Sequence, residues 1–321
     1  MGLITVIGSL NMDLVVRTPK MPQAGETLAG TEFHLIPGGK GANQSVAAAR
    51  AGAPTRMVGR VGTDAFGPVL LDSLAAAGVD ASGVSALSEV TTGTATIVVE
   101  DSGENRIIVV AGANGQVSLN FINDQWPAIR LSDLILLQHE IPLSTVHHII
   151  ERAYAEGIRV MLNPAPIYSI PRSTLAKVDT LILNEVEASA LTGLKVTDPA
   201  TARIVAATLA NLGVNTVIIT LGSNGAILHN SHYELFQPAF KVEVVDTTAA
   251  GDTFTGGYAA SILSGKQPPE ALMYAAAASA LAVTRLGAQT SIPSRDEVEA
   301  FLAAQITKIN GSPMFNTKGG G

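Results

Sequence analysis

Cysteine is absent from the 321-residue chain, and its absence removes several kinds of site at once. Without it there is no disulfide framework, no thiolate nucleophile and no cysteine-ligated zinc or iron–sulfur site. The six histidines show no HExxH spacing, the helical zinc signature of metalloproteases. The composition fits a chain that works in a reducing compartment without requiring one.

Positive charge and aromatic side chains are both scarce. Lysine and arginine number 20 against 27 aspartates and glutamates, which gives a formal net charge of −7, and only 4% of the residues are aromatic. A broad surface for nucleic acid or an anionic membrane needs clustered positive charge, and single-strand binders also stack bases on aromatic rings. We therefore expect no nucleic-acid or membrane partner, and any anionic ligand must be held locally.

Long apolar runs are missing too. The longest uncharged stretch of note, residues 271–284, is shorter than the roughly 20 apolar residues that a membrane helix requires. The first ten residues are apolar but lack a basic segment, and Asn11 and Asp13 follow at once, which is not typical of a signal peptide. We expect a buried helix at 271–284 and a cytoplasmic protein.

What the chain does contain is an alternation of short β-branched runs with longer alanine-rich segments. This alternation indicates an α/β fold in which helices cover both faces of a mainly parallel sheet. The predicted central strands are residues 3–8, 55–61, 133–137, 158–162, 180–183 and 216–220. The predicted helices are residues 41–51, 66–77, 144–155, 199–212, 251–264, 269–285 and 295–306.

Two regions depart from this alternation. Residues 14–17 with 27–36, and residues 92–100 with 106–110, alternate polar and apolar side chains around turn-rich segments. They are predicted to be antiparallel strands outside the main sheet, which would form either a lid or an extra hairpin at the sheet edge. The polar C-terminal residues 309–321 are predicted to be a flexible tail.

Neither of the two common nucleotide motifs of α/β proteins is present. Lys40 follows a glycine, but His34 occupies the earlier glycine position of a GxxxxGK[ST] motif. Gln44 stands where a GxGxxG motif requires its third glycine. A P-loop NTPase and an ordinary dinucleotide dehydrogenase are therefore both disfavoured.

The sharpest motif is DTTAAGDTFTGG, which begins at Asp246 and leads into an apolar helix. Small residues at 249–251 allow a tight turn whose amide N–H groups stabilise an anion, such as a transferring phosphoryl group, at the helix N-terminus. Asp252 has two interpretations, an N-terminal cap of the helix or a general base that accepts a hydroxyl proton. Spacing alone favours the cap, although the oxygen-rich residues 246–248 are more than a cap needs.

A second glycine-rich motif, GGKGANQ at 38–44, opens another helix. Its glycines allow the backbone to approach a ligand, Lys40 can reach anionic oxygens, and Asn43 offers a donor and an acceptor to hydroxyl groups. The alternative is a tight turn before a helix, for which one glycine is enough. Asn11 and Asp13 follow the first predicted strand, at the end where open α/β sheets bind ligands, and they suit contacts to a polyol.

These motifs together resemble the ribokinase family, within the wider phosphofructokinase-B-type carbohydrate kinases. GGKGANQ and DTTAAGDTF occur in this order, roughly two hundred residues apart, with QHEIP at 138–142, NPAP at 163–166 and LNEVE at 183–187 between them. The resemblance covers roughly the first 305 residues. It implies a three-layer α/β/α ribokinase-like core over residues 1–308, with a mainly parallel central sheet and small β-sheet lid segments at about 13–36 and 91–112.

The activity that this resemblance implies is ATP-dependent phosphorylation of D-ribose at O5 to D-ribose 5-phosphate. It assigns Asp252 as the general base, and the amides of Ala249, Ala250, Gly251 and Asp252 as an anion hole. The residues implied to hold the sugar are Asn11, Asp13, Gly39, Lys40, Asn43, Glu140 and Asp252.

The resemblance also implies ATP, Mg²⁺ and a monovalent cation, usually K⁺. The residues implied to contact ATP are Asn184, Thr220, Gly222, Ser223, Gly225 and Gly251. Mg²⁺ would be held mainly by phosphates and water, with Glu187 acting through water. The monovalent cation would take oxygens from Asp246, Thr248, Ala282, Arg285, Gly287 and Ser291.

Some alternatives stay open. Within the kinases, the acceptor could instead be 2-deoxyribose, fructose or a ribonucleoside. On the same fold, the chain could be a non-catalytic regulator that binds a sugar or a nucleotide. Ala276 stands where many relatives carry a polar residue against the adenine, so the adenine contact is open as well. In relatives the lid often pairs two subunits, which implies a homodimer.

Overall fold

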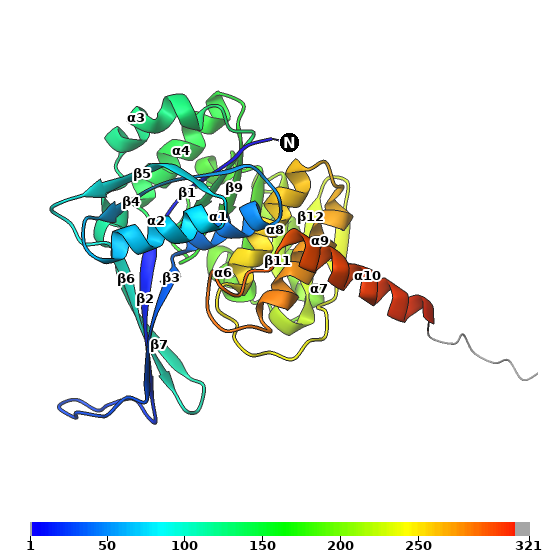
Figure 1. Cartoon of the computed structure of the whole chain (residues 1–321). Helices are drawn as coiled ribbons and strands as arrows, with labels where there is room; N and C mark the ends of the chain where they lie inside the picture. The colour runs from blue at the N-terminus through cyan, green and yellow to red at the C-terminus, as the bar shows by residue number, and fades with distance from the viewer. Residues whose placement is uncertain (1, 312–321) are drawn as a thin grey trace, which may run out of the picture.

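The structure is a computed structural model that describes residues 2–311, with side chains to residue 305, and it contains two separate sheets (Figure 1). The larger sheet has nine strands in the order β13-β12-β11-β10-β9-β8-β1-β4-β5. Neighbouring strands from β5 to β11 run parallel, and β12 and β13 are added antiparallel at one edge. The strands are β1 (Ile4–Ile7), β4 (Thr55–Gly62), β5 (Asp80–Leu87), β8 (Leu134–Gln138), β9 (Arg159–Asn163), β10 (Thr180–Asn184), β11 (Thr216–Thr220), β12 (Ala226–Asn230) and β13 (Glu234–Gln237).

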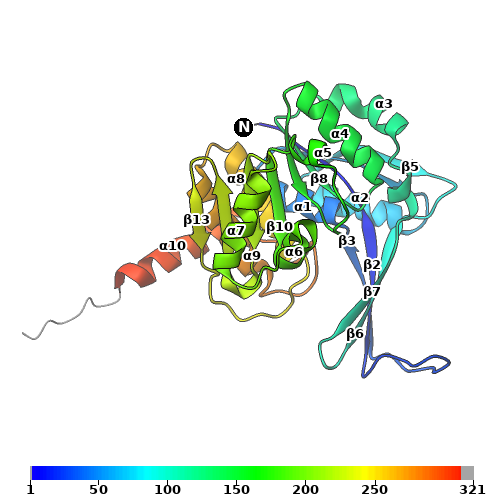
Figure 2. The ribbon, with the colours of Figure 1, turned by 180° about the vertical axis from the view of Figure 1, so that it is seen from behind.

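Helices cover both faces of this sheet, as the two opposite views show (Figures 1 and 2). Helices α1, α2, α8 and α9 contribute to one buried apolar cluster, and α3, α4, α6 and α7 contribute to another. The predicted three-layer α/β/α fold is therefore confirmed. The helices are α1 (Lys40–Arg50), α2 (Phe66–Ala76), α3 (Leu119–Ile129), α4 (Leu143–Ala155), α5 (Arg172–Leu175), α6 (Glu185–Thr192), α7 (Pro199–Ala210), α8 (Ala250–Leu263), α9 (Pro268–Ala282) and α10 (Arg295–Gly311), with 3-10 turns η1 (Gly112–Gln116) and η2 (Gly222–Asn224).

Glycines allow α1 to lie directly against both β1 and α8. A Cβ atom on Gly41 would lie 2.5 Å from the amide nitrogen of Ser9, at the end of β1. A Cβ atom on Gly256 of α8 would lie 2.6 Å from the carbonyl oxygen of Gln44 on α1. Both distances are shorter than a side chain permits, so these two contacts require glycine. They bring the first turns of α1 and α8 together.

The second sheet has four strands in the order β3-β2-β6-β7 and projects from the body of the molecule (Figure 1). Its strands are β2 (Asn11–Thr18), β3 (Glu32–Gly38), β6 (Gly93–Glu100) and β7 (Asn105–Val110). Because it is separate from the main sheet, the alternative of an extra edge hairpin is wrong. The two hairpins are antiparallel as predicted, but β2 and β6 pair in parallel, which the alternation of polar and apolar residues does not reveal.

The C-terminal helix α10 runs to Gly311, three residues into the segment predicted as a flexible tail. The remainder of that prediction, residues 312–321, lies outside the described residues. Over the part of the chain that the structure describes, no helix is both long enough and apolar enough to cross a membrane.

Candidate active site

Asp252 lies in the first turn of α8, and only 6% of it is exposed. No side chain caps the start of this helix. The Asp252 carboxylate instead accepts hydrogen bonds from Asn43 Nδ2 at 3.0 Å and from Gln44 Nε2 at 2.9 Å, both on α1. The cap interpretation is therefore wrong. The fold buries this carboxylate at the junction of α1 and α8, where each of its two oxygens accepts a hydrogen bond.

The turn that precedes α8 is conformationally costly. Ala249 has a φ of 58°, the only left-handed backbone of a non-glycine residue among residues 2–311. Such a backbone costs about 1–2 kcal/mol for a residue with a Cβ atom. Residues 249–252 all line a cavity of about 230 Å³, and the first N–H groups of a helix have no carbonyl of that helix to bind. The amide of Ala250 donates a 3.2 Å hydrogen bond to the Thr247 carbonyl, so this one of the four predicted donors is engaged in the structure.

The charged side chains that line this cavity are those of Lys40, Glu187 and Asp252. Lys40 lines it, and the Asp252 carboxylate raises the pKa of the Lys40 ammonium. Glu140 accepts hydrogen bonds from the Lys40 amide at 3.0 Å and from the Ser9 hydroxyl, so it caps the start of α1. The charges of Asp252 and Glu140 both favour the protonated, positively charged form of Lys40 and so raise its pKa.

Asp13 is also a buried carboxylate of this group, with 8% of it exposed. Burial, followed by the charges of Glu140 and Asp252, raises the pKa of Asp13 from 3.8 to about 7. A Cβ atom on Gly38 would lie 2.3 Å from the Asp13 carboxylate, so glycine at 38 leaves the space that this carboxylate occupies. The resemblance to the ribokinase family implied that Asp13, Glu140 and Asp252 share one site, and in the structure the charges of Glu140 and Asp252 act on Asp13.

Asn11 is held by a residue that the sequence did not point to. Asn114 Nδ2 donates to Asn11 Oδ1 at 2.7 Å and to the Leu10 carbonyl at 3.1 Å, and its own Oδ1 accepts from the Leu10 amide at 2.9 Å. Asn114 follows the lid strand β7, in η1, and it is 1% exposed. It fixes the Asn11 amide group so that the Asn11 donor faces away from Asn114.

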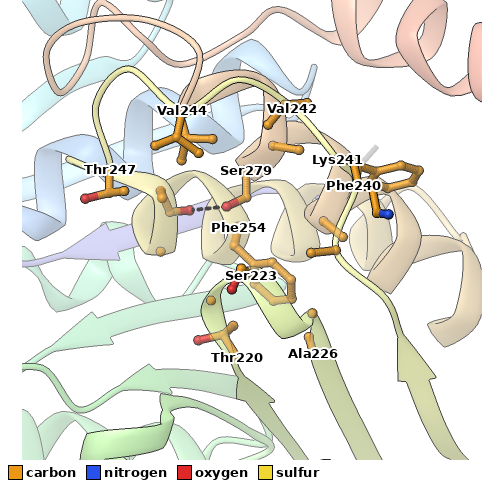
Figure 3. Close-up of a pocket in the computed structure, with 18 residues that line it drawn as sticks. Thr220, Ser223, Ala226, Phe240, Lys241, Val242, Val244, Thr247, Phe254 and Ser279 are labelled. Atoms are coloured by element: carbon orange, nitrogen blue, oxygen red, sulfur yellow. Dashed lines mark hydrogen bonds between the residues drawn. The ribbon is translucent and has the colours of Figure 1, made fainter.

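A second and larger cavity, of about 640 Å³, adjoins the first at the N-terminus of α8 (Figure 3). Thr220, Thr247, Ala250 and Gly251 line both cavities. In Figure 3, Val242 and Val244 lie across the pocket from Thr220 and Ser223. The predicted nucleotide residues Thr220, Gly222, Ser223, Gly225 and Gly251 all line it, as does Ala276.

Asn184 and Glu187 form the N-terminal capping box of α6 and line the smaller cavity. Asn184 Oδ1 accepts from the Glu187 amide at 2.8 Å, and Glu187 Oε2 accepts from the Asn184 amide at 2.9 Å. Burial raises the pKa of Glu187. Across the described residues, no group of three or more His, Cys, Asp or Glu side chains could hold a metal ion. The side-chain oxygens of Asn184 and Glu187 suit Mg²⁺, an ion that keeps several water ligands in proteins.

The loops predicted to hold a monovalent cation are joined through Asp246. Its Oδ1 accepts from the Thr248 amide and hydroxyl, and its Oδ2 accepts from the Gly287 amide at 2.9 Å. The amides of residues 245 and 246 both donate to the Val283 carbonyl. Of the remaining predicted ligands, Ala282 ends α9, Ser291 is fully buried in the following loop, and the Arg285 guanidinium pairs with Glu297. Carbonyl oxygens at the C-terminal end of α9, together with a carboxylate, fit a cation.

Comparison with known proteins agrees with this geometry. A family model described as pfkB family carbohydrate kinase matches residues 1–295, a range that includes every predicted site residue.

The chain belongs to the pfkB family of carbohydrate kinases.

Its relatives within the pfkB family include ribokinases and deoxyribokinases. A ribokinase of Haemophilus influenzae is 40% identical over 299 residues, which are 93% of this chain and 98% of the relative. A deoxyribokinase of Salmonella typhi is 36% identical over 301 residues, 94% of this chain and 98% of the relative. The solved structure of Arabidopsis thaliana ribokinase complexed with ribose and ATP has a TM-score of 0.87 and 34% identity, covering 94% of this chain and 98% of that one.

Proposed function

We propose that this pfkB-family kinase transfers the γ-phosphoryl group of ATP to O5 of D-ribose, with D-ribose 5-phosphate and ADP as products. The observation that carries the proposal is the position of Asp252, a buried carboxylate in the first turn of α8 that lines the smaller of the two cavities that meet there. The ribokinase relatives support the choice of substrate.

The sugar is proposed to lie against Asn11, Asp13, Gly39, Lys40, Asn43, Glu140 and Asp252. Carboxylates and amides match a polyol because each accepts from, or donates to, a hydroxyl group. Asn43 Oδ1 is buried and has no partner among the described residues, which leaves it as an acceptor for a hydroxyl group. The sugar hydroxyls complete hydrogen bonds that the protein alone leaves unmade.

Asp252 takes the proton of the O5 hydroxyl while O5 attacks the γ-phosphorus, and the bond from the γ-phosphorus to the ADP oxygen breaks. The amides of residues 249–252 and the Lys40 ammonium stabilise the negative charge of the phosphoryl group during transfer. Asn184 and Glu187 would hold the proposed Mg²⁺ through water, and the ion would supply positive charge that neutralises the phosphate oxygens. The nucleotide base and ribose occupy the 640 Å³ cavity.

The remaining proposals concern the cation, the lid and the assembly. Asp246, Thr248 and the loop after α9 hold a monovalent cation, for which K⁺ is proposed. Residues 1–308 form one kinase domain in which lid segments 13–36 and 91–112 close over the sugar and exclude water, a competing acceptor. We place the reaction in the cytoplasm, with which the cysteine-free composition agrees.

The outer face of the lid sheet is proposed to pair two subunits. Cross-strand register puts Leu35, Leu14, Thr96 and Ile108 in one row, so they share one face of the sheet. Asp13 is on the opposite face, toward the active site. The outer face includes Phe33, Leu35, Ile108 and Val110, each at least half exposed. A second copy of this chain would cover these apolar side chains, since single-chain proteins rarely leave such a patch open.

A panel of acceptors tests this function. ADP release is measured with Mg²⁺ and K⁺ for ribose, 2-deoxyribose, fructose, other sugars and ribonucleosides. We expect ribose to have the highest kcat/KM, because a site built to pair each hydroxyl leaves buried groups unmatched when one is missing. If kcat/KM is higher for 2-deoxyribose than for ribose, the substrate is 2-deoxyribose and the proposed substrate is wrong. If no acceptor is turned over while ribose raises the melting temperature, the chain is a non-catalytic regulator instead.

A further inference from the structure

Gln44 is fully buried, and its side-chain amide connects four elements of the core. Its Nε2 donates to Asp252 Oδ1 on α8 at 2.9 Å and to Asn163 Oδ1 at the end of β9 at 3.0 Å. Its Oε1 accepts from Gln138 Nε2 at the end of β8 at 2.7 Å. Every hydrogen and one lone pair of the amide are therefore in use without any substrate.

The orientation of the Gln44 amide is determined by groups that cannot exchange roles. Asn163 Nδ2 donates to the Ile182 carbonyl of β10 at 3.0 Å. A backbone carbonyl only accepts, so Asn163 must turn its Oδ1 toward Gln44. An ionised Asp252 carboxylate also only accepts, so both neighbours require the NH₂ end of Gln44. Turning the amide over would place oxygen against oxygen at two contacts.

Asn43 and Gln44 therefore play different parts at Asp252. Asn43 donates to Oδ2, and its own Oδ1 is left for a sugar hydroxyl, so its contact with Asp252 depends on how the sugar binds. Gln44 donates to Oδ1, and all its other contacts are with the protein. Among the residues whose side chains the structure describes, only Gln44 links the carboxylate by hydrogen bonds to the strands of the main sheet.

We infer that Gln44 is the positioning residue of the catalytic base: it holds the Asp252 carboxylate at a fixed angle, and Gln138 and Asn163 hold Gln44. The inference rests on the proposed function, since it requires Asp252 to be the base. General-base transfer needs the carboxylate oxygen within hydrogen-bond reach of the hydroxyl, and a small misplacement is costly. Gln44 acts through Asp252, and both hydrogens of its amide are used within the protein rather than on the sugar.

The first experiment compares Gln44→Met with Ser45→Ala. Methionine keeps the length and volume of glutamine but removes its hydrogen bonds. Ser45 is equally buried on α1, and its hydroxyl bonds only to the Ala42 carbonyl of the same helix, which makes it a matched control. We expect Q44M to lower kcat by about 100-fold, with the ribose dissociation constant, measured by calorimetry without nucleotide, within about threefold of wild type. S45A is expected to change neither quantity by more than about twofold.

The second experiment places Q44M in the Asp252→Asn background. If Gln44 acts through the base, Q44M lowers the residual turnover of D252N no further, because the two effects are not additive. Gln138→Met is an independent variant: it leaves Gln44 in place but removes Gln138 Nε2, which donates a hydrogen bond to Gln44 Oε1. We expect Q138M to lower kcat without weakening ribose binding, and the double variant with Q44M to be no slower than Q44M alone.

The outcomes separate the inference from the function on which it rests. If D252N loses its turnover while Q44M and Q138M stay within threefold of wild type, the Gln44 inference is overturned and the proposed function stands. The inference is also overturned if Q44M slows D252N by the same factor by which it slows the wild-type enzyme. That result would indicate general damage to packing. If D252N keeps nearly full turnover, the proposed function itself fails.

Discussion

The Asp246 carboxylate accepts a 2.9 Å hydrogen bond from the backbone amide of Gly287, which lies 41 residues further along the chain. This contact joins the loop before α8 to the loop after α9, the two segments proposed to hold a monovalent cation. The loop before α8 also ends in Ala249, whose left-handed backbone starts the helix that carries Asp252. A cation bound between the loops therefore bears on the geometry of the anion hole.

The cation prediction follows from this connection. Turnover in K⁺ is expected to exceed turnover in a large organic cation by at least about tenfold, because loss of anion-hole geometry weakens stabilisation of the transferring group. Asp246→Ala is expected to abolish the difference, and Thr290→Ala, on the loop after α9 but outside the proposed ligand set, to retain it. Equal initial rates in K⁺, Na⁺ and tetramethylammonium would remove the cation site from the account.

The raised pKa of Asp13 makes the free energy of unfolding depend on pH. The pKa of this buried carboxyl is about 7, against 3.8 for its ordinary value, so the folded protein keeps a proton between pH 4 and 7 that the unfolded chain has released. Asp13 therefore lowers the free energy of unfolding as pH rises through this window. Asp13→Asn removes that contribution. We expect its melting temperature, relative to wild type, to be higher at pH 8 than at pH 5.

Asp124→Asn is the control for this measurement, because Asp124 is exposed on α3. Its melting temperature should follow that of wild type across the same pH range. A D13N curve parallel to wild type from pH 5 to pH 8 would show that Asp13 is ionised throughout, contrary to the raised pKa.

The sequence predicted the elements that carry the site better than the order in which they pack. Both helices that bear catalytic groups begin at turns of small residues, which local chemistry identifies. The partners of Gln44 were not predictable, because Gln138 and Asn163 become its neighbours only through the strand order β9-β8-β1. Asn114 was missed for the same reason, since its contact with Asn11 depends on how the lid strands return to the core.

Local signals also explain which elements were missed. Helix α3 contains Pro127, which removes a backbone donor, and two asparagines, so its sequence does not resemble a helix. Strands β12 and β13 are short antiparallel additions at the edge of the sheet, with four or five residues each. Their sequences, AILHN and ELFQ, contain a single β-branched residue, Ile227, so they lack the β-branched runs that identified the central strands.

The proposed dimer contact on the lid sheet can be tested with one variant on each face of the sheet. Ile108 and Ile107 are adjacent in β7, are 68% and 54% exposed, and point to opposite faces of the lid sheet. Ile108→Glu places a charge on the proposed contact between two copies, so we expect the protein to become a monomer by sedimentation equilibrium. Ile107→Glu should leave the dimer intact. A monomeric wild-type protein, or loss of the dimer only in I107E, would contradict the proposed interface.

A substitution at Ala276 tests whether ATP binds in the 640 Å³ cavity. This residue lines the 640 Å³ cavity on the face of α9 that bears Ser279 and Ala280. Ala276→Phe fills part of the space proposed for the base, so we expect the KM for ATP to rise by at least about tenfold, with ribose binding unchanged. Ala276→Ser, which is similar in size, should keep the wild-type KM. An unchanged KM in A276F would place the nucleotide elsewhere.

The most direct test of the account is the initial rate of ADP release by Asp252→Asn, at saturating ribose and ATP with Mg²⁺ and K⁺. Asparagine keeps the shape of the side chain but cannot take the O5 proton. We expect the rate to fall by about 1,000-fold relative to wild type, while ribose still raises the melting temperature of the variant. A rate within tenfold of wild type would contradict the assignment of Asp252 as the base.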